Sequence, residues 1–283
     1  MMDGAESRVV VAARDYYNSD DADNFYFHVW GGEDIHIGLY ESDEEDIRRA
    51  SRRTVERLAG RLADVGPRTS VLDLGAGYGG AARWLARRYR CHVTCLNLSE
   101  AQNRRNRAMN REAGLDDLIE VHAGNFERIP FEDESFGVVW SQDSFLHSGA
   151  RETVLAAIDR VLEPGGAVVF TDPMQSDDCP PGVLAPVLER IHLQDLGSFG
   201  FYRAVARELG WTEVGCEDLT RHLVRHYARV ARELERQRAR LEGVVSAAYI
   251  ERMLRGLAAW VEAGERGYLA WGILHFRKPP RLA

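Results

Sequence analysis

Residues 71–80 read VLDLGAGYGG, a short apolar run that ends in a glycine-rich loop. The run predicts a buried strand, and residues 81–89 have the pattern of a helix. Gly75, Gly77 and Gly80 have the spacing in which a tight backbone turn brings a ligand close to a helix N-terminus. The loop is therefore a candidate ligand site, and the alternative is a strand-to-helix turn without a ligand.

Strands and helices alternate on both sides of this loop. Further apolar runs predict strands at 93–98, 119–123, 136–141 and 167–172, with helices from Ser99 and near 151–162. Residues 164–166, Pro-Gly-Gly, predict a tight turn before the strand at 167. Two more strand patterns stand at 212–217 and 269–276. The sequence thus predicts an α/β fold with a doubly wound, mostly parallel seven-stranded sheet and helical cover at both ends of the chain.

Composition limits the class of protein. Of 283 residues, 45% are hydrophobic and 28% charged, which excludes a disordered chain. Asp and Glu outnumber Lys and Arg by 44 to 36, and a net charge of −8 disfavours nucleic-acid binding. No apolar run approaches the roughly 20 residues that span a bilayer, and the N-terminus lacks a signal-peptide pattern. We expect a cytoplasmic monomer or homodimer without nucleic-acid or membrane partners.

Two residues near the glycine loop favour one cofactor. Asp73 precedes the first glycine, where it would repel a pyrophosphate. S-adenosylmethionine instead carries an ammonium group that an aspartate can bind and a carboxylate that can accept hydrogen bonds from the loop N–H groups. Asn97 ends the second predicted strand, where its amide can bind ribose hydroxyls. An acidic residue is more usual at that position.

Residues 73–80 resemble motif I of the class I S-adenosylmethionine-dependent methyltransferases. Three further matches follow in the order that this family has: GNF at 124–126, SQD at 141–143 and LEPGG at 162–166. The resemblance is strong over about 66–175. It implies a Rossmann-like methyltransferase fold with N-terminal lid or cap helices at 1–65, a cofactor-binding core at 66–175, and acceptor-side helices and final strands at 176–283.

The resemblance also implies S-adenosylmethionine as cofactor, S-adenosylhomocysteine as product, and no metal. Asn125 would bind the adenine amino group through its carbonyl oxygen, and Phe126 would pack on the ring. The expected cofactor-binding residues are Asp73, Gly75, Ala76, Gly77, Asn97, Leu98, Gln102, Asn125, Phe126 and Gln142.

Other stretches are similar to one subfamily. CLNLS at 95–99, WSQDSFLH at 140–147 and TDPM at 171–174 resemble the sarcosine/dimethylglycine N-methyltransferases of glycine betaine synthesis. This resemblance implies that methyl groups are transferred to the amine of sarcosine and N,N-dimethylglycine, small acceptors whose methylation gives glycine betaine. The phosphoethanolamine and natural-product methyltransferases are neighbouring families with the same Asp and His after the fourth strand.

Methylation of an amine requires a neutral nitrogen, so a proton acceptor would assist. Asp143 and His147 are four residues apart and would share one face of a helix that begins at Ser144. The aspartate would then orient the imidazole as a base. Tyr16, in the aromatic N-terminal stretch, is a third candidate catalytic residue. The alternatives are a structural His147 and N-terminal aromatic side chains that only pack on the sheet.

A carboxylate-bearing acceptor calls for hydrogen-bond donors. Arg203 is the candidate for a bidentate contact with that carboxylate, and a surface arginine is the alternative. Pro173 and Met174 would suit a methylated nitrogen better than a primary amine, while Tyr202 and Trp271 would add cation–π contacts. Two alternatives to the methylation of sarcosine and dimethylglycine stay open. One is methylation of another small molecule, such as phosphoethanolamine, a sugar or a natural product, and the other is a cofactor-binding regulator without catalysis.

Overall fold

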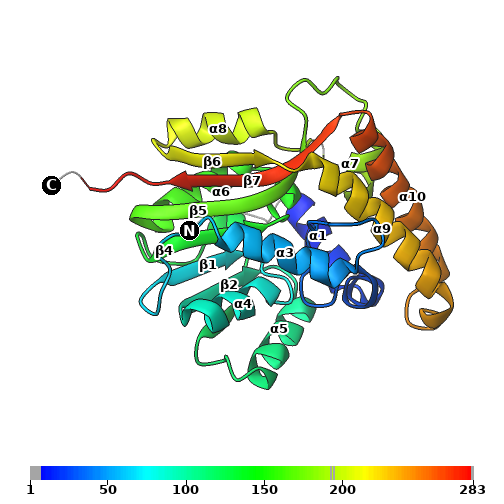
Figure 1. Ribbon diagram of the computed structural model, residues 1–283, viewed down its shortest axis with the longest axis horizontal. Coiled ribbons are helices and arrows are strands. Elements are labelled where there is room, and N and C mark those ends of the chain that lie inside the picture. The colour runs from blue at the N-terminus through cyan, green and yellow to red at the C-terminus, as the bar shows by residue number, and fades with distance from the viewer. Residues whose placement is uncertain (1–7, 192, 194, 282–283) are drawn as a thin grey trace.

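A seven-stranded sheet forms the centre of the computed structural model, which describes residues 8–191, 193 and 195–281. The strand order is β3-β2-β1-β4-β5-β7-β6, and β7 runs antiparallel to both of its neighbours, β5 and β6. Figure 1 shows the sheet running through the molecule between helices. The strands are β1 (Ser70–Leu74), β2 (His92–Asn97), β3 (Ile119–Ala123), β4 (Phe136–Gln142), β5 (Leu162–Gln175), β6 (Thr212–Asp218) and β7 (Leu269–Arg277).

The predicted sheet is confirmed, with one difference in β5. The expected turn at 164–166 is an irregular section of the strand itself, because Leu162 already lies opposite Phe136 of β4. The register then shifts before Ala167 pairs with Val138. Gly165 has a φ of +82°, a value that glycine adopts without strain. The proline and glycines thus bend a continuing strand.

Helices cover both faces of the sheet. Alternate strand residues point into two separate hydrophobic clusters. The cluster on one face includes side chains of α3 (Ile47–Ala59), α4 (Gly80–Tyr89), α9 (Thr220–Gln237) and α10 (Ala247–Glu265), with α5 (Glu100–Glu112) packed against it. The other cluster includes α6 (Arg151–Val161) and α8 (Phe199–Glu208). In Figure 1, α9 and α10 lie together at the opposite end of the molecule from the C-terminus.

The N-terminal segment is helical and then extended. It comprises α1 (Arg8–Asn18), α2 (Asp20–Phe25) and a π-helical turn, η1 (Tyr26–Trp30). The acidic run at 42–45 has the sequence pattern of a helix start, but no helix begins there. Helix α3 begins at Ile47, because the carboxylate of Asp46 accepts a hydrogen bond from the backbone N–H of Arg49 (3.2 Å) and caps the helix there.

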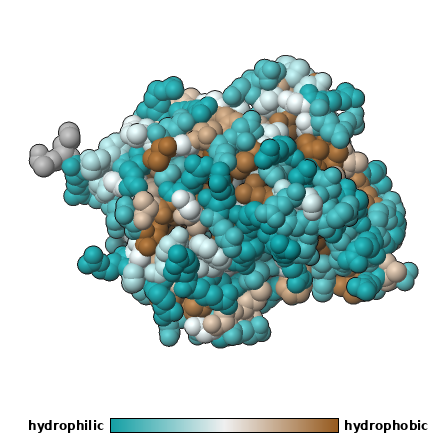
Figure 2. All heavy atoms as spheres, in the orientation of Figure 1, coloured by the Kyte–Doolittle hydropathy of each residue, from teal (hydrophilic) through white to brown (hydrophobic). Residues whose placement is uncertain are grey.

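Short elements complete the fold. They are α7 (Ala185–Ile191) and the 3-10 turns η2 (Phe126–Arg128), η3 (Phe145–His147) and η4 (Arg238–Arg240). The face seen in Figure 2 is mostly hydrophilic, and its hydrophobic areas are small and separate. Within the described ranges, every helix is too short or too polar to cross a membrane.

Phe170 gives a test of the packing between β5 and the α6–α8 side. It is fully buried and its ring lies 5.1 Å from the ring of Phe145 and 5.0 Å from that of Tyr202. We expect Phe170→Ala to lower the free energy of unfolding by about 3–5 kcal/mol, because it leaves a cavity in a close-packed core. Urea unfolding would measure this loss. Val214→Ala, at an exposed site on β6, is the control and should change it by less than about 0.5 kcal/mol. Equal losses in the two variants would contradict the packing described here.

Candidate active site

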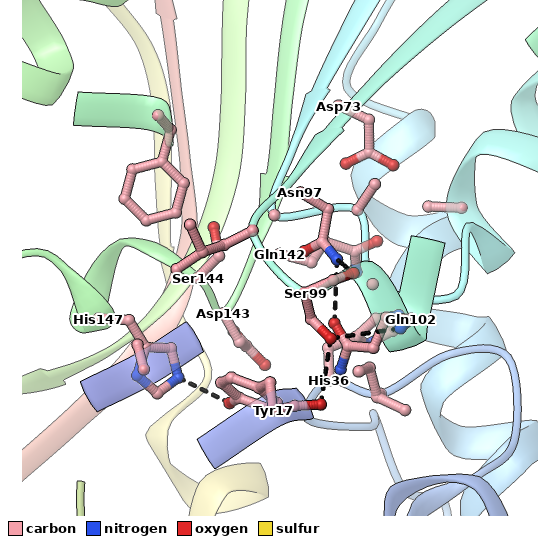
Figure 3. A pocket seen from close by; sticks show the side chains of 18 of the residues that line it. Tyr17, His36, Asp73, Asn97, Ser99, Gln102, Gln142, Asp143, Ser144 and His147 are labelled. Atoms are coloured by element: carbon pink, nitrogen blue, oxygen red, sulfur yellow. Dashed lines mark hydrogen bonds between the residues drawn. The ribbon is translucent and has the colours of Figure 1, made fainter. Parts of the chain in front are cut away.

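A cavity with about 910 Å³ of empty space lies at the carboxyl ends of β1, β2 and β4. Figure 3 shows Asp73 at one end of it and Tyr17 and His147 at the other. In open α/β sheets, ligands bind at this edge. All ten residues predicted to bind the cofactor line it: Asp73, Gly75, Ala76, Gly77, Asn97, Leu98, Gln102, Asn125, Phe126 and Gln142.

The glycine loop of this cavity has room only for glycine at its turns. Gly75 has a φ of +73°, and a Cβ there would lie 2.4 Å from the Cβ of Ser144. Gly77 has a φ of +52°, and its Cβ would lie 3.0 Å from Cδ1 of Ile35. Side chains at either position would therefore displace neighbouring residues as well as strain the backbone. The glycines thus let the backbone itself form this part of the cavity wall.

Two buried carboxylates face this cavity. Asp73 is 3% and Asp34 is 4% exposed. Among the described residues, Oδ2 of Asp73 and Oδ1 of Asp34 have no hydrogen-bond partner, although Oδ2 of Asp34 pairs with Arg52 at 2.8 Å. Burial raises the pKa of Asp73 to about 7, and the nearby Asp34 adds to this rise. Burial also raises the pKa of Asp34 to about 6. Unpaired carboxylate oxygens in such a place suit a cationic ligand group, such as an ammonium.

The amide side chains are arranged by hydrogen bonds around α5 and β4. The Asn97 amide nitrogen donates to Oε1 of Gln102 (3.1 Å), which leaves the Asn97 carbonyl oxygen to accept from a ligand hydroxyl. Oδ1 of Asn125 accepts from the backbone N–H of Glu127 (2.8 Å). The amide nitrogens of Gln102 and Gln142 are buried without an acceptor among the described residues. These two groups are further donors for a polar ligand.

A second, smaller cavity adjoins the first and has about 410 Å³ of empty space. The two cavities share five lining residues: Tyr17, Ile35, His36, Asp143 and His147. The rest of the second cavity is lined by Tyr26, Trp30, Ile37, Leu146, Pro173, Tyr227 and Trp260. The first cavity and the smaller, aromatic-walled cavity thus meet at these five shared residues, which we call the junction.

Asp143 lies at the junction, but its carboxylate is occupied by the protein. Oδ2 accepts from the backbone N–H of Ile37 (2.6 Å), and Oδ1 accepts from the hydroxyl of Thr171 (2.7 Å) and the indole N–H of Trp271 (2.8 Å). Burial raises the pKa of Asp143, while His36 and these hydrogen bonds act against the rise. The carboxylate therefore ties the N-terminal segment to β5 and β7.

His147 is held by Tyr17 rather than by a helical partnership with Asp143. The residues after Ser144 form only the three-residue turn η3, and Asp143 itself has a φ of +53°. This backbone removes the helical i, i+4 geometry that the spacing predicts. Instead, Nε2 of His147 lies 2.8 Å from the hydroxyl of Tyr17. Asp143 and His147 still line both cavities together.

Tyr16 is next to Tyr17 in the chain but is not part of the Tyr17–His147 contact. Its hydroxyl lies 2.8 Å from that of Tyr249 and 3.3 Å from that of Tyr26, and Tyr16 is not among the residues that line either cavity. The adjacent Tyr17 is the tyrosine at the junction. Because α1 turns consecutive side chains by about 100°, the sequence does not distinguish which tyrosine points inward.

His36 is a neutral imidazole at the junction. Burial lowers its pKa to about 4, and the neighbouring Asp143 opposes that fall. Its Nδ1 lies 3.3 Å from the carbonyl oxygen of Ile37, while Nε2 has no hydrogen-bond partner in the described part of the chain. His36 therefore presents an uncharged ring to both cavities near neutral pH.

The residues predicted to bind the acceptor are dispersed. Pro173 lines the second cavity, whereas Met174 is fully buried in the hydrophobic cluster on the α6–α8 face. The Tyr202 hydroxyl donates to Oδ2 of Asp172 (2.7 Å) in that same cluster. Arg203 is 42% exposed and pairs with Glu213 at 3.0 Å. Trp271 reaches the junction indirectly, by donating to the carboxylate of Asp143.

Comparison with known proteins identifies the family. A family model described as a methyltransferase domain matches residues 72–170. The sarcosine/dimethylglycine N-methyltransferase of Halorhodospira halochloris is 58% identical over 273 residues, which are 96% of this chain and 98% of that protein. This chain belongs to the sarcosine/dimethylglycine N-methyltransferase family.

Two further relatives extend the comparison with this N-methyltransferase. The glycine/sarcosine/dimethylglycine N-methyltransferase of Actinopolyspora halophila is 56% identical over 271 residues, which are 96% of this chain but 48% of that protein. The crystal structure of a candidate sarcosine dimethylglycine methyltransferase from Galdieria sulphuraria has a TM-score of 0.89 and 45% identity, and the alignment covers 94% of this chain and 100% of that one. The comparison of folds and the comparison of sequences therefore indicate the same family.

Several residues that line the two cavities were not predicted from the sequence. Asp34 and His36 follow the paired glycines at 31–32 in a short polar run, and that run was the available signal. Tyr227 and Trp260 lie on the apolar faces of α9 and α10. In sequence, such residues look the same as core residues. Across the described ranges, no group of three or more His, Cys, Asp or Glu side chains is placed to hold a metal ion.

The charge on Asp73 gives a pH-dependent prediction for the ligand-free enzyme. Its folded pKa of about 7 lies above the ordinary 3.8, so the folded state keeps a proton that the unfolded state loses between these values. Stability should therefore fall as pH rises from about 4 to about 7. We expect Asp73→Asn to be roughly 2–4 kcal/mol more stable than wild type at pH 8, with a smaller difference at pH 5. Urea unfolding at both pH values measures this.

Asp117→Asn is the control for the Asp73 variant, because Asp117 is exposed at the surface. It should leave the pH dependence of unfolding as in the wild type. A less stable Asp73→Asn protein at pH 8 would show that the buried carboxylate has a cationic partner in the ligand-free enzyme.

Proposed function

We propose that the enzyme transfers methyl groups from S-adenosylmethionine to the nitrogen of sarcosine and N,N-dimethylglycine, and that glycine betaine is the final product. The observation that carries this proposal is the junction of the two cavities. One cavity has the carboxylates and donors that suit a nucleoside bearing an amino-acid group, and the other is small and walled by aromatic rings. A methyl group passing between their occupants would cross the junction that the two cavities share.

The relatives support the choice of acceptors. The Halorhodospira protein, which this chain matches over nearly its whole length, is named for sarcosine and dimethylglycine. The relative whose name includes glycine is about twice as long, and this chain matches 48% of it. Glycine methylation is therefore not part of the proposed activity.

The residues of the larger cavity fit S-adenosylmethionine. Asp73 and Asp34 would hold its ammonium group, because Oδ2 of Asp73 and Oδ1 of Asp34 have no hydrogen-bond partner among the described residues. The backbone N–H groups of the glycine loop would hold its carboxylate. Asn97 would accept from the ribose, and Phe126 would pack on the adenine. When bound, this cofactor supplies a methyl group activated by a positively charged sulfur.

The junction residues prepare the acceptor nitrogen. An apolar, aromatic surrounding disfavours an ammonium that carries N–H protons, so it lowers the pKa of the bound amine. His147 takes up the proton that the amine loses, and the Tyr17 hydroxyl, 2.8 Å from its Nε2, fixes the orientation of the ring. Asp143 holds Ile37 in the wall of the smaller cavity through one hydrogen bond, and Trp271 donates another to the same carboxylate. Alignment of the two reactants then provides most of the rate enhancement.

Two other functions fit the structure less well. A phosphoethanolamine acceptor requires basic side chains for its phosphate, but the described residues that line the smaller cavity include no Lys or Arg. A regulator without catalysis does not require an acceptor cavity, yet such a cavity adjoins the cofactor site. The aromatic wall suits a methylated amine, because a cationic nitrogen can make cation–π contacts with the rings.

The first test of this function is a panel of acceptors. With S-adenosylmethionine and equal concentrations of glycine, sarcosine or dimethylglycine, we expect the last two to react and glycine to react at least tenfold more slowly. Each unpaired ammonium proton of glycine costs about 1–3 kcal/mol against an apolar wall. Initial rates, with betaine identified by mass spectrometry, measure this preference. Glycine reacting as fast as dimethylglycine, or no betaine in any reaction, would refute the proposed acceptor.

The second test concerns the proton acceptor. His147→Ala should lower kcat about 10²–10⁴-fold, as expected for loss of a general base, while S-adenosylhomocysteine affinity measured by calorimetry changes little. His122→Ala, at a half-exposed histidine paired with Glu120, is the matched control and should keep wild-type kcat. A His147→Ala enzyme with wild-type turnover from pH 6 to pH 9 would exclude the role of His147 as a base.

A further inference from the structure

The smaller cavity has two distinct ends. Five of its lining residues are shared with the cofactor cavity, and among them are Tyr17, Asp143 and His147. The remaining wall, which includes Trp30, Tyr227 and Trp260, belongs to the smaller cavity alone. An amino acid methylated at the junction must direct its nitrogen toward the shared end. Its carboxylate must then lie toward the unshared wall, which we call the distal wall.

The distal wall contains two indole N–H groups without an acceptor. Trp30 is 4% and Trp260 is 1% exposed, and Nε1 of each has no hydrogen-bond partner among the described residues. A buried donor without a partner is costly, and most buried donors in proteins have one. Trp211 is the contrast within this chain, because its Nε1 donates to Oδ1 of Asp159 (2.7 Å).

Ring packing fixes the positions of these two indoles. The ring of Tyr227 lies 4.8 Å from that of Trp260 and 5.8 Å from that of Trp30, so it touches both. Trp30 also packs against His226 at 5.0 Å and Tyr26 at 5.2 Å. Rings held on several sides cannot turn their N–H groups toward a new partner within the protein. A ligand in the cavity is the partner that remains.

We propose that the indole N–H groups of Trp30 and Trp260 bind the carboxylate of the acceptor. This assignment rests on the proposed function, since it requires a carboxylate-bearing amine. It replaces Arg203, which pairs with Glu213 at the surface. Neutral donors hold the carboxylate without cancelling its charge. The carboxylate therefore stabilises the positive charge that develops on the nitrogen, which a guanidinium in the same place would oppose.

The experiment compares two ligands of nearly equal shape, N,N-dimethylglycine and N,N-dimethylglycinamide, in which a neutral amide replaces the carboxylate. Their affinities are measured by calorimetry on enzyme saturated with S-adenosylhomocysteine, so that no reaction occurs. Wild-type enzyme should prefer dimethylglycine. Trp30→Phe and Trp260→Phe should each reduce that preference about tenfold or more, the effect of losing one hydrogen bond to a charged group. Loss of packing alone would weaken both ligands equally and leave the preference unchanged.

Two controls separate the effect of losing the N–H group from the effect of changing the ring. Trp211→Phe removes a buried indole N–H away from the cavity, and its ligand preference should equal that of wild type. Replacing Trp30 or Trp260 by β-(3-benzothienyl)alanine keeps the ring shape and removes only the N–H group, so it tests the same point if a phenylalanine variant does not fold. This replacement should also reduce the preference about tenfold or more.

The outcomes distinguish failure of the indole assignment from failure of the proposed function. An unchanged preference in both tryptophan variants, with wild-type enzyme that binds and methylates dimethylglycine, would overturn the indole assignment alone. A wild-type enzyme that neither binds nor methylates dimethylglycine would overturn the proposed function. A reduced preference at Trp30 and Trp260, together with an unchanged one at Trp211, would establish both indoles as carboxylate ligands.

Discussion

The buried carboxylate of Asp143 is the interaction on which the site depends. It joins three parts of the chain that lie far apart in sequence: the backbone at Ile37, the hydroxyl of Thr171 on β5 and the indole of Trp271 on β7. This anchor helps to hold the N-terminal segment across the sheet edge. That segment supplies Asp34 to one cavity and His36 to both. Loss of the anchor would open the two cavities at their shared wall.

Much of the fold was predictable because its signals are local. Alternating apolar runs and glycine turns predicted all seven strands, and the loop at 75–80 predicted the position of the larger cavity. The misplaced details have physical causes. A Pro-Gly-Gly sequence is typical of a turn, yet strand pairing keeps residues 164–166 within β5. The run of acidic residues after Ser42 resembles a helix start, but Asp46 has the capping geometry.

The site was predictable only where it follows a strand end. Most of the residues proposed to bind the cofactor lie at or just after the carboxyl ends of β1, β2, β3 and β4, so their places along the chain reveal them. The distal wall is different, because Trp30 and Trp260 come from opposite ends of the chain and meet only through α9 and α10 packing. Asp143 and His147 were selected for a helical pairing that the left-handed backbone at Asp143 does not allow. Long-range contacts of this kind leave no pattern in one sequence.

The two buried carboxylates beside the glycine loop affect the enzyme inside a cell. Oδ2 of Asp73 and Oδ1 of Asp34 have no hydrogen-bond partner among the described residues, which costs free energy whenever the cavity holds no cation. The empty protein therefore opens more readily than the loaded one. Proteases degrade open chains first. The lifetime of the enzyme should therefore follow the supply of its methyl donor. A cell short of that donor would clear the catalyst as well as slow the reaction.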